Sequence, residues 1–183
     1  MTATTLDPRT ALVVVDLQKG VVSLPGVHQA DDVVARSAEL AAAFRAKGLP
    51  VVFVRVTGGA PGRTESPARG GTPAADWADL VDGLGVRDSD IVVTKQGWGA
   101  FYGTDLDLRL RRRGVTQVVL TGVATSRGVE STARSAHEYG YHVTVVTDAV
   151  ADMDEGMHRN SIDKVFPKLG ETDTTDAIVK LLG

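Results

Sequence analysis

Residues 11–16 read Ala-Leu-Val-Val-Val-Asp, a run of five apolar side chains followed at once by a carboxylate. An apolar run of this length without alternating polar positions is typical of a strand covered on both faces, as in a parallel sheet. Comparable runs rich in β-branched residues recur at 51–56, 91–94, 118–121 and 143–147. Together they predict a sheet of buried parallel strands.

Between these runs lie segments in which apolar residues have helical spacing, at 33–44, 106–113 and 128–139. The expected signals at their ends are Thr104 as N-cap of the second, Thr125 or Ser126 as N-cap of the third, and Gly48, Gly114 and Gly140 as stops. Strand–helix–strand repetition predicts βαβ units. We therefore expect an α/β fold: a three-layer, doubly wound, mostly parallel sheet of about six strands with helices on both faces.

The composition describes an ordinary globular chain and excludes several classes of function. The chain has 183 residues, 43% hydrophobic content, a net charge of −3 and no cysteine. Without cysteine there is no disulfide framework, thiolate metal site or thiol nucleophile, and without a basic tract we expect no nucleic-acid partner. No composition shift marks a second domain, so one domain over residues 1–183 is expected.

Targeting and cofactor motifs are also missing from the sequence. The first residues lack a secretory signal and the apolar run near the start is too short to span a bilayer, so we expect a cytoplasmic protein without a membrane partner. Neither a GxGxxG dinucleotide fingerprint nor a P-loop is present, and no cofactor is expected. The exceptional stretch is 58–73, rich in Gly and Pro, which should form a long loop over the carboxyl edge of the sheet.

Three features point to that same edge. Asp16 ends the first run, Lys95 ends the third, and the fourth leads into a Gly-flanked turn, 122–128, which enters a helix. In doubly wound sheets ligands bind beyond the carboxyl ends of the strands. A carboxylate there can move a proton, a lysine can hold it ionised or bind an anion, and N–H groups at a helix start can stabilise an oxyanion. Taken singly, each is equally compatible with a turn residue, a solvated charge or a turn glycine.

Other candidate motifs are weaker. His137-Glu138 and His142 form an HExxxH pattern interrupted by Gly140, whose spacing puts the two imidazoles on different faces, so no metal site is expected. Trp98, Phe101 and Tyr102 follow Lys95 closely and fit either core or subunit packing or a wall of the substrate site.

The stretches 95–106, 110–115 and 119–134, with the segment around Asp16 and the later Thr-Asp-Ala at 147–149, closely resemble the isochorismatase-like hydrolase superfamily. The resemblance covers nearly the whole chain in three ordered motifs. Most members of that superfamily are cysteine hydrolases of amides such as nicotinamide or N-carbamoyl compounds. Their triad of Asp, Lys and Cys corresponds here to Asp16, Lys95 and Gly128, so the resemblance implies a site without its thiol.

Losing the thiol is compatible with one branch of that superfamily. True isochorismatases resemble this chain in having Gly at the Cys position, and they cleave a vinyl ether, releasing pyruvate, without a covalent intermediate. A vinyl ether is activated by an acid, a role that Asp16 held protonated in an apolar pocket would fill. Lys95 would bind a substrate carboxylate or tune Asp16. The metal site of nicotinamidase-type members is also missing, since the region after the second run reads Arg55-Val-Thr-Gly-Gly.

The resemblance further implies a substrate site and an assembly. The expected substrate-binding residues are Gln18, Trp98, Phe101, Val123, Ala124, Thr125 and Arg127. The resemblance also implies a cis peptide at Val123–Ala124 and a homodimer or homotetramer, for which Trp98 is a candidate residue of the subunit contact. A substrate carboxylate has three candidate partners on charge grounds, Arg63, Arg69 and Arg127.

Two other functions stay open at this point. The chain can be a catalytically silent member that binds a small metabolite or serves as an oligomeric scaffold. It can also retain amide hydrolysis with Ser126 or Ser131 in place of the thiol, which is disfavoured because neither serine occupies the Cys position and no histidine base is evident nearby. The partner expected for the hydrolase is a small-molecule substrate.

Overall fold

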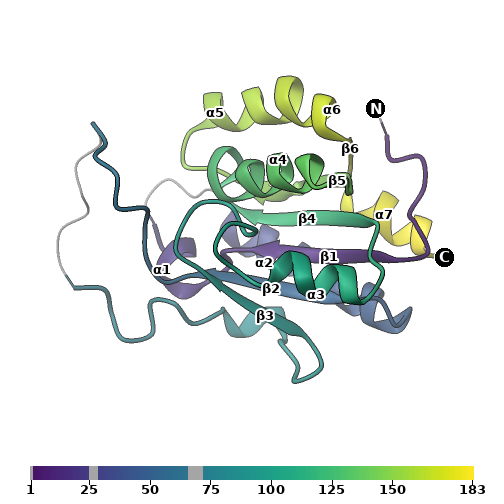
Figure 1. Ribbon diagram of the computed structural model, residues 1–183, viewed down its shortest axis with the longest axis horizontal. Coiled ribbons are helices and arrows are strands. Elements are labelled where there is room, and N and C mark those ends of the chain that lie inside the picture. Colours follow the sequence, from purple (N-terminus) through teal and green to yellow (C-terminus); the bar gives the residue numbers. More distant parts are fainter. Residues whose placement is uncertain (1, 25–28, 66–71) are drawn as a thin grey trace.

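The computed structural model describes residues 2–24, 29–65 and 72–183 and contains a six-stranded sheet (Figure 1). The strand order is β3-β2-β1-β4-β5-β6, and every neighbouring pair is parallel. The strands are β1 (Thr10–Val15), β2 (Val51–Val56), β3 (Ile91–Lys95), β4 (Gln117–Val123), β5 (His142–Ala151) and β6 (Glu171–Asp173). The chain winds outward in both directions from β1, so the strand order reverses between β1 and β4.

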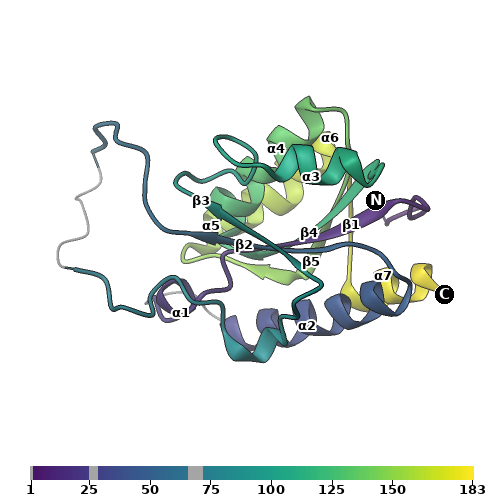
Figure 2. The ribbon, with the colours of Figure 1, turned by 60° about the horizontal axis from the view of Figure 1, so that its bottom comes forward.

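Helices cover both faces of this sheet, as Figure 2 shows. One face packs against α2 (Ala30–Ala46), α7 (Thr175–Leu182) and the 3-10 turn η1 (Asp82–Leu84). The other packs against α3 (Leu106–Arg112), α4 (Glu130–Glu138) and α6 (Phe166–Leu169). The remaining helical segments are α1 (Lys19–Val22), α5 (Glu155–Asn160) and two π-helical turns, η2 (Thr125–Val129) and η3 (Ser161–Val165).

The central strand β1 is buried along its whole length because its alternate side chains enter two separate cores. Ala11, Val13 and Val15 pack toward α3 and α4, and Leu12 and Val14 pack toward α2. An uninterrupted apolar run is therefore what this position requires. The predicted three-layer α/β fold is confirmed.

Two strands differ from the sequence-based expectation. β3 is not covered on both faces: it is an edge strand in which Val92 and Thr94 are exposed while Ile91, Val93 and Lys95 are buried. β5 continues beyond the apolar run at 143–147 to Ala151, past an irregularity in its pairing with β4. Which strand lies at the edge depends on strand order, which the sequence of one strand does not contain.

The predicted helices are present, and their ends are only partly as expected. Gly48, Gly114 and Gly140 each follow a helix with a positive φ, as the stop signals predict. Thr125 and Ser126 are not N-caps, because the turn η2 precedes α4 and their side chains have other partners. The N-cap of α3 is Asp105, although the Thr104 hydroxyl still accepts a hydrogen bond from the amide of Leu106.

The long loop that follows β2 begins at the carboxyl edge, but its described first part does not lie over the sheet. Residues 57–65 are all exposed, and Figures 1 and 2 show this stretch extending outward from the strand ends. Within the described part of the chain, no helix is long and apolar enough to cross a membrane.

Candidate active site

The carboxyl end of β1 carries a buried carboxylate. Asp16 directly follows the strand with a left-handed backbone, φ 54°, and only 6% of the residue is exposed. Its Oδ2 accepts a hydrogen bond from Lys95 Nζ at 2.8 Å. Its Oδ1 is buried and has no hydrogen-bond partner among the residues that the structure describes. One oxygen is thus fixed by a cation while the other is uncommitted.

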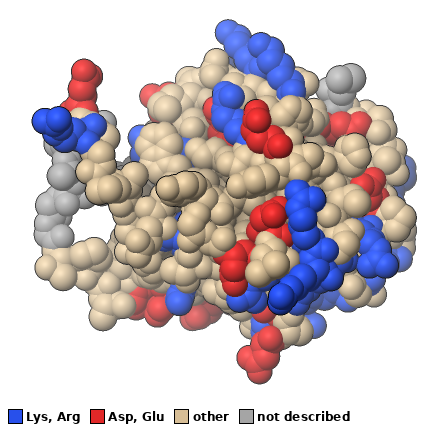
Figure 3. Space-filling model, in the orientation of Figure 1, with Lys and Arg blue, Asp and Glu red and all other residues tan. Residues whose placement is uncertain are grey.

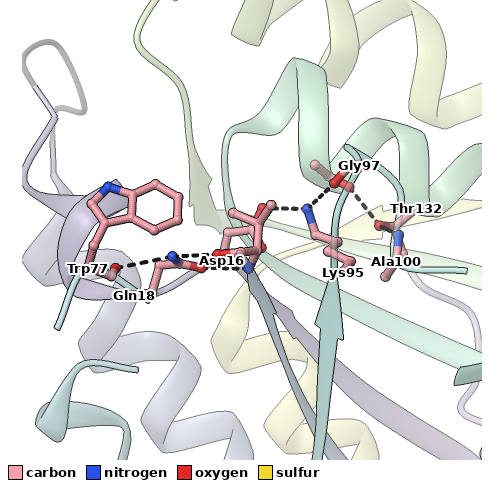
Figure 4. A network of polar contacts seen from close by, with 9 residues as sticks. Asp16, Gln18, Trp77, Lys95, Gly97, Ala100 and Thr132 are labelled. Carbon is pink, nitrogen blue, oxygen red and sulfur yellow. Dashed lines mark hydrogen bonds and ion pairs between the residues drawn. The ribbon is translucent and has the colours of Figure 1, made fainter. Parts of the chain in front are cut away.

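Lys95 reaches this carboxylate from the edge of the sheet. It ends β3, two strands away from β1, and its extended side chain crosses the carboxyl end of β2 with only 1% of its side-chain surface exposed. Besides Asp16, Nζ donates to the carbonyl of Gly97 at 2.9 Å. Figure 4 shows the ammonium held between these two acceptors. A buried lysine with two fixed acceptors serves as a stationary positive charge rather than a mobile surface group.

Burial and the ammonium act on the Asp16 carboxyl in opposite directions. Removal from water disfavours the carboxylate and raises its pKa, whereas the charge and hydrogen bond of Lys95 lower it. Burial is the larger effect, so the pKa of Asp16 rises from 3.8 to about 6. A carboxyl with this pKa carries a proton in an appreciable fraction of molecules near neutral pH and can give it up.

Gly128 brings the start of the following helix against this pair. A Cβ at Gly128 would lie 3.1 Å from Asp16 Oδ2, 3.0 Å from Val15 Cγ1 and 3.2 Å from the carbonyl of Val123. The turn that leads to it contains the expected cis peptide, Val123–Ala124. The backbone of Gly128 therefore lies beside the carboxylate, where even a Cβ would make tight contacts.

The backbone of β4 also approaches β1 closely just before this turn. At Gly122, φ is +118° and a Cβ would lie 2.0 Å from the carbonyl oxygen of Val15. Only glycine fits between the two strands, and this close approach sets Asp16 beside the turn after β4.

A cavity of about 330 Å³ opens onto the Asp16–Lys95 pair, at the point where the strand order reverses. Its lining comes from the carboxyl ends of β2, β3 and β4, the residues that closely follow β1, β2, β4 and β5, the region of α1, and the segments around Trp77 and Trp98. The described lining residues are Asp16, Val21, Leu24, Val56, Gly58, Gly59, Trp77, Lys95, Gly97, Trp98, Val123, Ala124, Arg127, Gly128 and Met153. None of these described residues carries a hydroxyl, thiol or imidazole.

Of the predicted substrate-binding residues, Trp98, Val123, Ala124 and Arg127 line this cavity. Trp98 is 64% exposed, and the guanidinium of Arg127 lies over its ring, 5.8 Å from the ring centroid. Together they form a wall with an aromatic surface and a cation at the mouth. Arg127 is thereby placed to meet an anionic substituent of a ligand.

Gln18, Phe101 and Thr125, by contrast, are not among the described residues that line the cavity. The ring of Phe101 is buried, with its centroid 5.4 Å from that of Tyr139 and 5.8 Å from that of Tyr141. Phe101 therefore belongs to the core, where an aromatic side chain packs best away from solvent.

Gln18 is hydrogen-bonded to the backbone of two residues that line the cavity, Val56 and Trp77. Its side-chain amide donates to the carbonyls of Val56 at 3.0 Å and Trp77 at 3.2 Å, and its oxygen accepts from the amide of Val56 at 2.7 Å. Figure 4 shows Gln18 between the backbone of Trp77 and the carboxyl end of β2, to which it is bonded at Val56. Its amide is fully engaged by the protein, so it positions the cavity wall.

The side chains of Thr125 and Ser126 have partners on the far side of the turn. Thr125 Oγ1 lies 2.9 Å from His158 Nδ1, and both the amide and the hydroxyl of Ser126 donate to Asp152 Oδ2 at 2.7 Å. His158, which is isolated in the sequence, is thus half-buried against the turn. These bonds tie η2 to the segment after β5.

Sequence reasoning missed Trp77. Its carbonyl accepts from the amide of Gly20 at 3.0 Å, and its indole packs so closely that a Cβ at Gly20 would lie 1.9 Å from Cδ1. An aromatic residue in a polar stretch, Ala-Asp-Trp-Ala-Asp at 75–79, is the signal that could have found it.

The described lining of the cavity does not include three other polar residues that the sequence singled out, Arg63, His137 and His142. Arg63 is in the exposed loop after β2, and Arg69 falls outside the described residues. His142 begins β5 while His137 is in α4, and within the described residues no cluster of His, Asp or Glu is arranged to hold a metal ion.

Comparison with known proteins identifies the family. The model of the isochorismatase domain matches residues 10–177. The chain belongs to the isochorismatase family. It is 43% identical to an uncharacterised isochorismatase family protein, YecD of Escherichia coli O157:H7, over 94% of this chain and 96% of that one. The chain is thus a hydrolase of the isochorismatase family.

Two further relatives bear on the fold and the chemistry. An isochorismatase family protein from Burkholderia thailandensis has a solved structure with TM-score 0.93 and 47% identity, covering 97% of each chain. The ureidoacrylate amidohydrolase RutB of Methylobacterium radiotolerans is 34% identical over 97% of this chain and 81% of its own. The family around this chain therefore includes amide-hydrolysing members.

Proposed function

We propose that this family member hydrolyses a vinyl ether of a small carboxylic acid, of the isochorismate type, with Asp16 as general acid and no covalent intermediate. The observation that supports it is a buried Asp16–Lys95 pair facing a cavity whose described lining offers no hydroxyl, thiol or imidazole. The proposed hydrolysis therefore uses a proton from Asp16 and a water molecule.

A single carboxyl group, that of Asp16, supplies the proton for this reaction and recovers one from water. Asp16 gives its proton to the terminal CH₂ carbon of the vinyl ether, and the ether carbon becomes an oxocarbenium ion. Water adds to that carbon and returns a proton to the Asp16 carboxylate. The resulting hemiketal passes its hydroxyl proton to the ether oxygen as the bond to that oxygen breaks, releasing an alcohol and a 2-oxo acid, which is pyruvate when the substrate is isochorismate.

The neighbouring residues have separate roles in this proposal. Lys95 holds Oδ2, so the acidic proton belongs on Oδ1, the oxygen without a partner among the described residues. Gly128, where we place the nucleophile position of the family's amidases, leaves room beside the carboxylate for the ether group or the water. Arg127 at the mouth would bind the substrate carboxylate.

The positions of two serines weigh against amide hydrolysis with a substitute nucleophile. Neither Ser126 nor Ser131 is among the described residues lining the cavity, and the Ser126 hydroxyl is bonded to Asp152. Acyl transfer needs a nucleophile within reach of the substrate carbonyl and a base beside it. This arrangement favours acid catalysis over a serine variant of the amidase reaction.

The test is to incubate the protein with isochorismate and couple pyruvate formation to lactate dehydrogenase. We expect turnover that is lost by at least about a thousandfold in Asp16→Asn, since the acid is removed while the shape is kept. Asp163→Asn, a change at an exposed aspartate in η3, is the matched control and should retain full activity.

Turnover no higher than that of Asp16→Asn would contradict the substrate. In that case binding of isochorismate, measured by calorimetry, separates a silent binding protein from an enzyme for another ether. Binding that survives in Asp16→Asn without turnover in either protein would support the silent member instead.

A further inference from the structure

A second hollow lies at the amino edge of the sheet, at the opposite ends of the strands from Asp16. Its volume is about 840 Å³, and its lining residues come just before or at the start of β1, β2, β3 and β4. We call it the arginine hollow; it is lined by Pro8, Arg9, Arg45, Gly48, Leu49, Pro50, Val51, Arg87, Ser89, Asp90, Arg113 and Val115. A volume of this size is in the range of pockets that hold an organic ligand.

Four arginines from four different segments line it, and Asp90 carries the single carboxylate among the described lining residues. That carboxylate is already neutralised: Arg45 Nε donates to Oδ1 at 3.0 Å and Nη2 donates to Oδ2 at 2.6 Å. The pair is buried, with 11% of the arginine and 3% of the aspartate side chain exposed. This buried pair carries no net charge, so the positive charge of the hollow comes from the other three arginines.

The other three arginines leave donors free. The side chain of Arg87 has no hydrogen-bond or ion-pair partner among the residues that the structure describes, although its backbone amide donates to Asp90 Oδ2 at 2.7 Å. Arg9 Nη1 donates to the carbonyl of Arg113 at 3.1 Å, and its stem lies over Gly114. Arg113 Nη1 donates to the carbonyl of Arg109 at 3.1 Å. These three cations face the hollow without a carboxylate partner.

This local excess of positive charge runs against the net charge of −3. On α3, two of the arginines are paired with aspartates one turn earlier, Arg109 with Asp105 and Arg111 with Asp107. Arg113, at the end of this helix, has no such partner among the described residues. Figure 3 shows basic side chains gathered over α3, toward the side where the strands begin.

We propose that the arginine hollow binds an oligophosphate anion, with a nucleoside diphosphate as the occupant of matching size. Guanidinium groups bind phosphate oxygens through paired, charge-assisted hydrogen bonds, and three uncompensated cations suit a ligand with two or more negative charges. The half-buried apolar side chains of Leu49 and Pro50 supply a surface for a flat ring. The site is separate from the cavity at Asp16 and does not depend on the proposed reaction.

Calorimetric titration of the whole protein with ADP, inorganic pyrophosphate and adenosine tests this binding. We expect ADP and pyrophosphate to bind and adenosine to give no measurable binding up to about 1 mM, because the phosphates carry the recognition. ADP binding tighter than pyrophosphate identifies the nucleotide rather than the free anion as the occupant. Affinity should fall as salt concentration rises.

Single substitutions locate the site. Arg87→Gln and Arg113→Gln should each weaken ADP binding by about tenfold, the value of one charge-assisted contact. Arg159→Gln, which removes an exposed arginine on α5, should leave it unchanged. The proposal is overturned if ADP and pyrophosphate do not bind, if Arg159→Gln weakens binding as much as Arg87→Gln, or if Arg127→Gln abolishes it, which would place the ligand at the other cavity.

Discussion

At the carboxyl edge of the sheet one ion pair is almost completely removed from water, whereas at the amino edge four arginines surround an open hollow. Asp16 and Lys95 have 9% and 1% of their side-chain surface exposed. At the amino edge, Arg9, Arg87 and Arg113 are all exposed. Both edges use charge, and at the first of them burial raises the pKa of the Asp16 carboxyl to about 6. A buried carboxyl with such a pKa is suited to proton transfer, whereas the exposed arginines of the amino edge are suited to binding an anion.

The two edges also differ in how their charges are satisfied. Lys95 is held by two fixed acceptors, and Asp16 keeps one oxygen without a partner among the described residues. The exposed arginines of the hollow keep several donors in contact with solvent, so their removal costs the fold little. Substitutions at the two edges should therefore differ strongly in their effects on stability.

The largest expected effect is that of Lys95→Met, which leaves the Asp16 carboxylate buried without a cation. We expect the free energy of unfolding at about pH 8 to fall by about 3–5 kcal/mol. The loss should be smaller at about pH 5. Because the pKa of Asp16 is higher in the folded than in the unfolded chain, its contribution to stability is present at low pH and lost as pH rises through the folded value.

Urea unfolding of the single and double variants measures this effect. Asp16→Asn combined with Lys95→Met removes both charges and should recover most of the stability lost in Lys95→Met. An equal loss at both pH values, or no recovery in the double variant, would mean that the cost is one of packing rather than of an unpaired charge.

The next effect is on the pH dependence of the proposed vinyl ether hydrolysis. The protonated form of Asp16 is the acid, and its pKa is about 6. Well above this value kcat/KM should fall about tenfold for each pH unit, and between pH 6 and pH 8 the total fall should be about fiftyfold, since half of the carboxyls are already ionised at pH 6. A profile measured from about pH 4.5 to 8.5 checks this. A rate that instead rises through pH 6 would assign Asp16 the role of base.

A smaller effect is expected from filling the space at Gly128. In Gly128→Ala the new methyl group would meet Val15, Asp16 and Val123 at 3.0–3.2 Å, so we expect about 1–3 kcal/mol of lost stability and reduced turnover. Gly62→Ala, where a Cβ meets nothing within 4 Å, is the control and should change neither. Unfolding curves and pyruvate release measure both quantities.

Gly128→Cys at the same position tests the family relationship of the site. If the thiol position of the amidases is here, this variant should gain measurable ammonia release from an N-carbamoyl compound, while Gly128→Ser and the unsubstituted protein should not. Absence of any gain in a folded Gly128→Cys protein would argue that the Asp16–Lys95 pair is not arranged for thiol chemistry.

The smallest effect on stability belongs to the amino edge. Arg87→Gln removes an exposed side chain without a described partner and should change the free energy of unfolding by less than about 0.5 kcal/mol. Arg45→Gln, in contrast, leaves Asp90 buried without its cation and should be clearly destabilising. Thermal or urea unfolding of the two variants compares them directly, and equal losses of stability would show that the Arg45–Asp90 ion pair does not stabilise the fold.

The central strands and the convergence of Asp16 and Lys95 were predictable because each depends on local sequence and on one rule of parallel sheets. The apolar run at 11–15 requires burial on both faces, and residues that end parallel strands meet at one edge. The exposed face of β3 was not predictable in this way, since strand order decides it. The same holds for β6, a strand of three half-buried residues without an apolar run.

The partners of polar side chains were the least predictable part of the site. Ser126 and Thr125 have the sequence signature of N-caps, but Asp152 and His158 bind them from 26 and 33 residues away. Gln18 matches a family motif and was expected to bind substrate, yet its side-chain amide donates hydrogen bonds to the backbone carbonyls of Val56 and Trp77. Local patterns do not state which distant acceptor a hydroxyl or amide will find once the chain is folded.

Lys95 reaches Asp16 from the outermost strand on its side of the sheet, across 79 positions of sequence. The ion pair therefore exists only while β3 is docked on β2, and β3 has neighbours on one side and exposed residues on one face. Edge segments of this kind open at a lower free energy than the core of a sheet. Heat should thus inactivate the enzyme before the central strands unfold. The exchange of the β3 amide hydrogens should report the rate at which β3 undocks from β2 and the Asp16–Lys95 pair is broken.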